Sequence, residues 1–386
     1  MDLKIFFSPI DDAVFEGITD TTSFYKSISI FSEKQPDFKG ANIALLGILE
    51  DGGSISNLGA TKGADEIRKK LYRLKKGFGQ YKIVDLGNLR KGIDVSESQL
   101  RLKEVCSTLI ENDVLPIIIG GTHDHTYGQY LAYENLDKLV SLLNVDAFLD
   151  IEDEGNTVTS TNHLHKILLH EPNFLFSLNQ LAYQSYLIDI DTLAVLEKLY
   201  FDAYRLGHLR QHLPDMEPII RDADLMSFDI TSVRSSDAPG NRNAQPFGLT
   251  GEEACQICWY AGLNEKMSSV GFYEYNPDVD DEHKKTAAVT ATMIWYFIEG
   301  FYHRKDEQNF RGNDYLKFVV PMPNEPENIV FYKSKLSEKW WLEVPYPHTK
   351  FLYERNLIVP CSYTDYQLAA KGEVPERWIT TQAKLI

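Results

Sequence analysis

The sequence predicts a three-layer α/β/α domain with a mainly parallel sheet, followed by a C-terminal extension. Short apolar runs alternate with segments of helical periodicity, which is the pattern of parallel strands joined by helices. The runs consist almost entirely of Val, Ile, Leu and Phe, as expected for strands that are buried on both faces. They lie at Ile43–Leu49, Ile83–Leu86, Leu115–Ile119, Val140–Asp146, Phe174–Leu178, Leu225–Phe228 and Ser269–Tyr273.

Helices are predicted between these runs. Ala64–Lys75 and Leu100–Ile110 repeat apolar residues at intervals of three and four, so each should present one stripe to the sheet. Thr286–Phe301 is apolar nearly all round and is expected to be a buried helix. Cys255 and Cys258 fall in a further helical segment and are expected to be buried thiols, because no second pair of Cys or His has matching spacing.

Composition divides the chain into an N-terminal segment (1–40), a main domain (41–305) and a C-terminal extension (306–386). Asp306–Asp314 is polar and is interpreted as a linker or loop. The sequence after it is rich in aromatic residues and proline, including the pair Trp340 and Trp341. Exposing so many aromatic side chains would create an adhesive patch, so the extension is expected to pack on the main domain. A self-association surface is the alternative.

The charge balance restricts the partners. Of 386 residues 56 are acidic and 39 basic, which gives a net charge of −17. That field repels phosphate backbones and anionic lipids, so neither nucleic acid nor a membrane surface is expected as a partner. No run approaches the roughly 18 apolar residues of a membrane span, and the first residues lack the pattern of a signal peptide. A cytoplasmic location is expected.

Polar residues that can bind a metal ion follow three of the apolar runs. His123 follows Leu115–Ile119, Asp146 and Asp150 follow the next run, and Asp229 follows Leu225–Phe228. The carboxyl ends of parallel strands lie at one edge of a sheet, where ligands gather. Imidazole and carboxylate donors suit a divalent cation such as Mn²⁺, which can lower the pKa of bound water.

These clusters resemble the metal motifs of the ureohydrolase superfamily (arginase, agmatinase and formimidoylglutamase). The shared patterns are Gly-Gly-x-His ending at His123, Asp-Ala-x-x-Asp at Asp146–Asp150 and Ser-Phe-Asp ending at Asp229, in the same order. Asp237–Gly240 followed by Pro246–Leu249 is similar to the formimidoylglutamase branch. The resemblance covers about residues 40 to 305 and implies an arginase-like fold there.

The resemblance also implies a metal centre that has lost part of its ligands. The family uses two manganese ions bridged by carboxylates and by a hydroxide that attacks a guanidino or formimino carbon. The histidine that would bind the second ion falls on Phe148, and a carboxylate falls on Thr231. At most one Mn²⁺ per chain is therefore expected, or none. The ligands of the first ion would be His123, Asp146, Asp150 and Asp229.

Two further residues are implied to act on the substrate. His165 lies near the position of a family histidine that shuttles protons, although a loop histidine without a role is the alternative. Gly271–Pro277 resembles the motif whose glutamate, here Glu274, holds the amidinium group. A glutamate that merely caps a strand end is the alternative for Glu274.

Two hypotheses for function remain open. The first is hydrolysis of a C–N bond, other than a peptide bond, in a linear cationic amidine, with formimidoylglutamate as the favoured substrate. The second is a catalytically inactive pseudoenzyme that serves as a binding or scaffold module. In that case no small-molecule substrate is needed, and the extension would contact a protein partner or a second copy of the chain.

Overall fold

A computed structural model describes residues 3–54, 56–152, 157–307, 310, 312–324, 326–345 and 358–385. The strands of the main sheet are β1 (Phe7–Ser8), β2 (Ser29–Ile30), β3 (Ile43–Ile48), β4 (Ile83–Leu89), β5 (Leu115–Ile119), β6 (Val140–Val145), β7 (Leu175–Tyr183), β8 (Asp202–Arg205), β9 (Leu225–Asp229) and β10 (Ser269–Tyr273). Their order is β1-β4-β3-β5-β10-β9-β6-β7-β8, with β2 beside β4. Only β1 pairs antiparallel among the described strands of this sheet. The mainly parallel sheet is confirmed.

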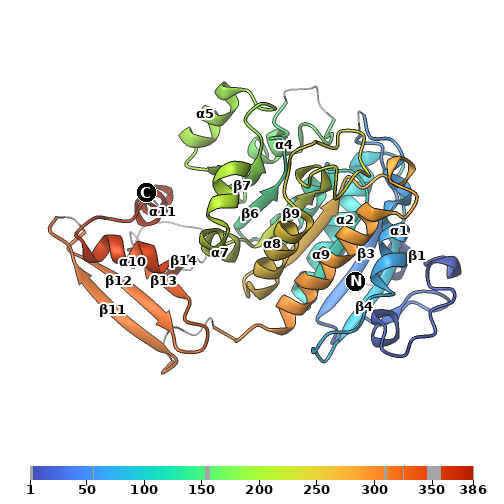
Figure 1. Ribbon diagram of the computed structural model, residues 1–386, viewed down its shortest axis with the longest axis horizontal. Coiled ribbons are helices and arrows are strands. Elements are labelled where there is room, and N and C mark those ends of the chain that lie inside the picture. Colours follow the sequence, from blue (N-terminus) through green and yellow to red (C-terminus); the bar gives the residue numbers. More distant parts are fainter. Residues whose placement is uncertain are drawn as a thin grey trace.

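Helices cover both faces of the sheet (Figure 1). They are α1 (Gly63–Leu71), α2 (Val95–Glu111), α3 (His125–Asn135), α4 (His163–Leu168), α5 (Ile190–Lys198), α6 (Leu206–Gln211), α7 (Glu217–Arg221), α8 (Gly251–Leu263) and α9 (Lys285–Tyr302). Apolar residues of α1, α8 and α9 form one buried cluster with the sheet. Those of α2 and α3 lie in clusters built on residues of the opposite face, since neighbouring strand positions alternate between faces. The three-layer α/β/α prediction is confirmed.

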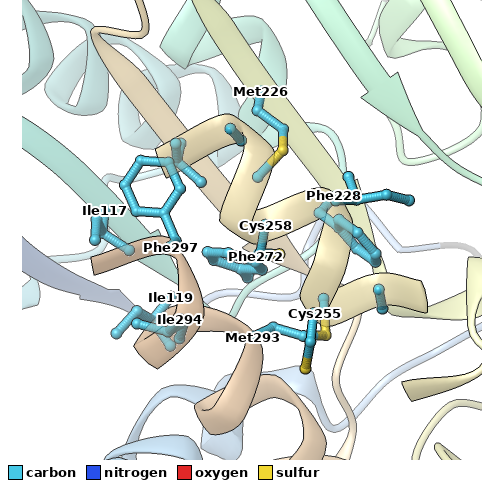
Figure 2. Packing of buried hydrophobic residues seen from close by; sticks show 14 of the residues in the cluster. Ile117, Ile119, Met226, Phe228, Cys255, Cys258, Phe272, Met293, Ile294 and Phe297 are labelled. Atoms are coloured by element: carbon cyan, nitrogen blue, oxygen red, sulfur yellow. The ribbon is translucent and has the colours of Figure 1, made fainter. Parts of the chain in front are cut away.

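The layer formed by α8 and α9 shows how the core is packed (Figure 2). Cys255 and Cys258 lie on α8 among apolar side chains that include Met293 and Phe297 of α9. Both thiols are buried and form no disulfide. Burial raises the pKa of Cys255 to about 12 and that of Cys258 well above its usual value. The thiols therefore stay protonated, which agrees with the predicted structural role.

The extension is a separate antiparallel sheet with two helices. Its elements are β11 (Tyr315–Pro321), β12 (Asn328–Ser334), β13 (Trp340–Glu343), β14 (Ile358–Cys361), α10 (Tyr363–Ala370) and α11 (Glu376–Leu385). Two hydrogen bonds connect it to the main domain: Arg221 of α7 donates to the Trp340 carbonyl at 3.1 Å, and Lys384 donates to Ser177 at 3.0 Å. The boundaries at residues 40 and 305 stay predictions. No described helix has the length and hydropathy needed to cross a bilayer.

Candidate metal centre

The four predicted ligands come together at the carboxyl edge of the sheet. His123 lies in the β5–α3 loop, Asp146 and Asp150 follow β6, and Asp229 ends β9. The Nδ1 atom of His123 lies 3.3 Å from Asp146 Oδ2, 3.1 Å from Asp150 Oδ2 and 3.4 Å from Asp229 Oδ2. One donor atom from each residue falls within 4.8 Å of the others. These four residues are called the ligand cluster below.

Two glycines allow the loop after β5 to deliver His123 to this point. Gly120 and Gly121 have φ values of 81° and 74°, which only glycine adopts without strain. A Cβ atom on Gly121 would lie 2.6 Å from the Ile48 side chain, so the chain passes too close to β3 for any larger residue. The backbone N–H of His123 then donates to Glu274 Oε1 at 2.9 Å. The Gly-Gly-x-His pattern is thus explained by the turn as well as by the histidine.

A hydrogen bond to Nε2, the ring nitrogen that faces away from the carboxylates, fixes the orientation of the His123 ring. Its Nε2 lies 2.8 Å from the Ser227 hydroxyl, which is in turn 2.5 Å from the Thr126 hydroxyl. A partner on one ring nitrogen sets the tautomer and leaves the other nitrogen to face the metal, as is usual around ligating histidines. Because Nε2 has the serine, Nδ1 is the atom that faces the three carboxylates.

The electrostatics of the ligand cluster favour a cation. Burial and the charge of Asp146 raise the pKa of both Asp150 and Asp229. Burial opposes protonation of His123, but the three carboxylates that lie 3.1 to 3.4 Å from its Nδ1 outweigh burial and raise the His123 pKa well above its usual value. Asp146 Oδ2 is buried and accepts no hydrogen bond within the described chain, although His123 Nδ1 is 3.3 Å away. An orphaned acceptor inside a surplus of negative charge is what a divalent cation would satisfy, so these residues fit one.

The position of the second family ion is altered in a specific way. Phe148 offers only its backbone N–H, which donates to Asp146 Oδ1 at 3.0 Å. The Thr231 hydroxyl donates to the same oxygen at 3.2 Å, and the Thr231 N–H donates to Asp229 Oδ1 at 2.6 Å. The carboxylate oxygens on this side therefore already have protein donors, whereas Asp146 Oδ2 has none.

The histidine that the structure brings to the ligand cluster is His163. Its Nδ1 lies 3.6 Å from Asp150 Oδ2, and its ring centre lies 4.2 Å from that of His123. His163 is fully buried, and burial together with the charge of His123 lowers its pKa well below the usual value. His165 lies two residues further along α4, is partly exposed, and does not belong to any metal-compatible group found among the described residues. The sequence reasoning overlooked His163, although it lies in the same short motif.

Glu274 is buried beside the ligand cluster and its backbone is unusual. Its φ is 68°, in the left-handed region that a non-glycine residue seldom adopts, and Asp150 has a φ of 46°. Asn57 Nδ2 donates to Glu274 Oε2 at 2.7 Å, and Asn241 Nδ2 donates to the Glu274 carbonyl at 2.7 Å. Burial, with a contribution from the charge of Asp229, raises the pKa of Glu274 to about 8. An arriving cation would lower that pKa and stabilise the carboxylate.

A cavity of about 460 Å³ opens over this group of residues. Asp150, Asp229 and Glu274 reach its wall, and Phe148 and Thr231 lie beside them. The volume is within the range of small-molecule sites. Ligand cluster, cavity and buried glutamate thus form one site.

Comparison with known proteins places this arrangement in a family. The model of the arginase family matches residues 41–299. The chain is 25% identical over 299 residues to formimidoylglutamase of Lysinibacillus sphaericus, covering 72% of this chain and 92% of that protein. It is 27% identical over 272 residues to formimidoylglutamase of Staphylococcus haemolyticus, covering 66% of this chain and 85% of that protein.

Solved structures share the fold. A crystal structure of Trypanosoma cruzi formiminoglutamase with Mn²⁺ superposes with a TM-score of 0.64 at 23% identity, covering 70% of this chain and all of that one. Formimidoylglutamase of Bacillus subtilis gives 0.66 at 19% identity, covering 75% of this chain and 95% of that one. The arginase-like fold and the resemblance to the formimidoylglutamase branch are confirmed. The chain belongs to the arginase family.

Proposed function

We propose that this protein hydrolyses a C–N bond in a small linear amidine with the help of one Mn²⁺-like ion. The observation that carries the proposal is the convergence of His123, Asp146, Asp150 and Asp229 beside a cavity whose wall includes Asp150, Asp229 and Glu274. When bound, such an ion would act as a Lewis acid and lower the pKa of a water molecule. The chain itself would supply orientation, charge and proton transfer.

Glu274 is the residue proposed to orient the amidine. Its carboxylate is held by the Asn57 amide and by the backbone of His123, so it needs little reorganisation when substrate arrives. A charge-assisted pair between this carboxylate and an amidinium would fix the reacting carbon near the ligand cluster. Because burial raises the pKa of Glu274 to about 8, binding of a cation would release a proton near neutral pH.

His163 is proposed to take the proton-transfer role expected for His165. Its Nδ1 lies 3.2 Å from the Ser160 carbonyl, which can only accept, so the proton is assigned to Nδ1. Its Nε2 is then an unprotonated acceptor, and that atom is buried with no hydrogen-bond partner in the described chain. Because the pKa of His163 is low, this nitrogen would relay a proton during turnover rather than hold it.

The charge of the cavity favours an amidine without carboxylates. Five acidic residues line the wall, whereas no Lys or Arg is among the described residues that do so; the acidic residues are Asp150, Glu152, Asp189, Asp229 and Glu274. Formimidoylglutamate, the substrate favoured by the resemblance, carries two carboxylates that would meet this negative surface unpaired. A purely cationic amidine such as agmatine is therefore proposed in its place.

A single ion is proposed because the second position lacks donors. Phe148 has no side-chain lone pair, and the Thr231 hydroxyl is already directed at Asp146. An ion there would have only the two shared carboxylates and water, and would be lost readily to a chelator. Slow hydrolysis is expected for the same reason.

The test is elemental analysis after manganese loading, together with release of urea from agmatine and arginine and of formamide from formimidoylglutamate. We expect at most one ion per chain and slow turnover, with agmatine preferred. Phe148→His with Thr231→Asp should raise the metal content toward two ions and increase the rate, whereas either single change should do less. Two ions in the wild type would contradict the proposal for the metal centre.

The altered second position also favours a second candidate, a binding module without catalysis. It would keep the cytoplasmic location expected from the sequence and use the cavity or the extension to bind a partner. One bound ion without hydrolysis of any amidine would select this candidate. Turnover that depends on manganese and is abolished by Glu274→Gln would exclude it.

A further inference from the structure

A second cavity lies at the opposite edge of the sheet, between the main domain and the extension. Its volume is about 260 Å³, and it is called the interface cavity. The main domain contributes residues at the starts of β6 and β9 and at the ends of α7 and α8. The extension contributes Lys339 and Trp341, among others, and Phe310 comes from the connecting segment.

Arg221 lines the interface cavity and has one unused donor group. The residue is only 6% exposed. Its Nε donates to Glu217 at 2.9 Å, its Nη2 donates to the Trp340 carbonyl at 3.1 Å, and the guanidinium carbon lies 4.3 Å from the centre of the Trp341 ring. Its Nη1 is buried and has no hydrogen-bond partner in the part of the chain that the structure describes. A buried charged donor without an acceptor is unfavourable, so an acceptor from a ligand would stabilise Arg221 Nη1.

Lys339 adds a second cation that is poorly compensated. Its Nζ lies 3.7 Å from Glu217 Oε1, which is the oxygen that Arg221 already occupies. Burial lowers the pKa of Lys339, although the charge of Glu217 opposes the shift. Two cations thus share the Glu217 carboxylate at this wall of the cavity, and the charges of Glu307 and Glu265 contribute less to Lys339 than that of Glu217.

The other charged groups on the wall have ion-pair or hydrogen-bond partners of their own. Lys266 pairs with Asp222 and with Asp224, at 3.2 and 3.3 Å, and Lys138 pairs with Asp224 at 3.2 Å. The side chain of Glu307 accepts a hydrogen bond from the Ser337 hydroxyl at 2.5 Å. Glu265 accepts from the backbone N–H groups of Lys305 and Glu307, at 3.0 and 2.6 Å. None of these acids compensates Arg221 Nη1.

We infer that the interface cavity binds a small anion through a phosphate or carboxylate group held by Arg221 and Lys339. A guanidinium with a free N–H, fixed in place by Glu217 and by stacking on Trp341, is a rigid donor for an oxyanion. The lysine would supply a second donor from the extension, so the anion would bridge the two parts of the molecule. The volume suits inorganic phosphate or a short carboxylic acid rather than a nucleotide.

Isothermal titration calorimetry of the full chain with inorganic phosphate and, separately, with succinate tests this inference at constant ionic strength in chloride. One saturable site per chain is expected for at least one of the two anions. The anion that binds identifies the group recognised, phosphate or carboxylate. Absence of saturable binding of both anions to the wild type would overturn the inference.

Substitutions locate the site. Lys339→Gln leaves every described contact of Arg221 intact and should weaken binding about tenfold or more, as expected for a lost charge-assisted hydrogen bond. Arg221→Gln should weaken it further, but it also removes contacts to the extension, so Lys339→Gln is the decisive variant. Lys371→Gln, at an exposed position of the extension, is the matched control and should bind as the wild type does. Equal affinity in Lys339→Gln and in the control would place the anion elsewhere and overturn the inference.

Discussion

The two edges of the main sheet bury different charged groups. At the carboxyl edge three aspartates surround one histidine, and at the amino edge Arg221 and Lys339 share Glu217. The same strands reach both places: β6 carries Ser141 at the interface cavity and leads into Asp146, and β9 is preceded by Asp224 and ends at Asp229. Five residues of strand separate Ser141 from Asp146, or roughly 17 Å.

The comparison shows how unpartnered atoms indicate the sign of a ligand. The atoms without a hydrogen-bond partner include an acceptor, Asp146 Oδ2, at the carboxyl edge and a donor, Arg221 Nη1, at the amino edge. Asp224 Oδ1 at the amino edge also accepts no hydrogen bond, but it lies 3.2 Å from Lys138 Nζ. Buried polar atoms are nearly always paired, so an unpaired one of each sign favours a cation at one edge and an anion at the other. The family accounts for the first site. The second involves an extension that lies outside the matched residues 41–299.

Asp146→Asn should have the largest effect on the carboxyl edge. The substitution removes the charge of a proposed metal ligand, so manganese affinity is expected to fall more than about 100-fold, beyond the loss usual for an indirect partner of a metal. Elemental analysis and competition with a chelator measure this change. Glu152→Gln is the control, because Glu152 lines the same cavity outside the ligand cluster. One ion retained by Asp146→Asn would show that the metal binds elsewhere.

Glu274→Gln should alter the pH dependence of stability in chelator-treated protein. The folded-state pKa is about 8 and the ordinary value is 4.5, so between these pH values the folded state holds a proton that the unfolded state has lost. The protonated Glu274 carboxyl therefore contributes fully to the stability of the folded state below about pH 4.5. This contribution is lost as the pH rises through about 8. Urea unfolding at pH 5, 7 and 9 measures it.

The glutamine variant has no such proton, so its stability should not show this part of the decrease with rising pH. The difference between wild type and variant should shift by roughly 3 to 5 kcal/mol in favour of the variant between pH 5 and 9. A pH-independent offset is also expected, because Asn57 loses its charged partner. A difference that stays constant with pH would contradict the raised pKa.

His163→Gln should weaken manganese binding or turnover about tenfold, as is usual for residues that orient a metal site. His163 Nδ1 lies 3.6 Å from Asp150 Oδ2, and its ring centre lies 4.2 Å from that of His123. His165→Gln is the matched control on the same helix and should change both quantities less than about twofold. The reverse order of effects would restore the original assignment to His165. The comparison isolates one position, because the two histidines lie two positions apart on the same helix.

The sequence allowed the apolar strands and the four residues of the ligand cluster to be predicted, since each follows an apolar run in a parallel sheet. The predicted strand Phe174–Leu178 stopped too early, because β7 continues through the polar residues Asn179 and Gln180. Gln180 is buried and accepts a hydrogen bond from the side chain of Asn144 in β6. Its own amide donates to the carbonyls of Asp146 and Phe148, which follow that strand. Polar residues paired across strands interrupt the apolar pattern without interrupting the strand.

The interface cavity could not be predicted from sequence, for a different reason. Arg221 and Lys339 are 118 positions apart, and nothing in the local pattern of either indicates that they share Glu217. His163 was overlooked because its place is set by the β6–α4 loop, whose path depends on tertiary contacts such as the hydrogen bond from the Leu164 N–H to the Asp150 carbonyl. The sheet determines the positions of residues at strand ends, whereas tertiary packing determines the positions of Arg221, Lys339 and His163.

The smallest effect is expected for coupling between the two edges. The orphaned atoms lie at opposite ends of the strands, and sites farther apart than about 7–10 Å that share no partner usually combine additively within about 0.5 kcal/mol. Asp146→Asn should therefore leave the affinity for phosphate or succinate unchanged within about twofold, and Lys339→Gln should leave the manganese content unchanged. Calorimetry of each variant with the other ligand measures both. The two measurements must agree, because coupling between binding sites is reciprocal. A matching shift in both would show that β6 and β9 transmit the occupancy of one edge to the other, and the extension would then regulate the metal centre.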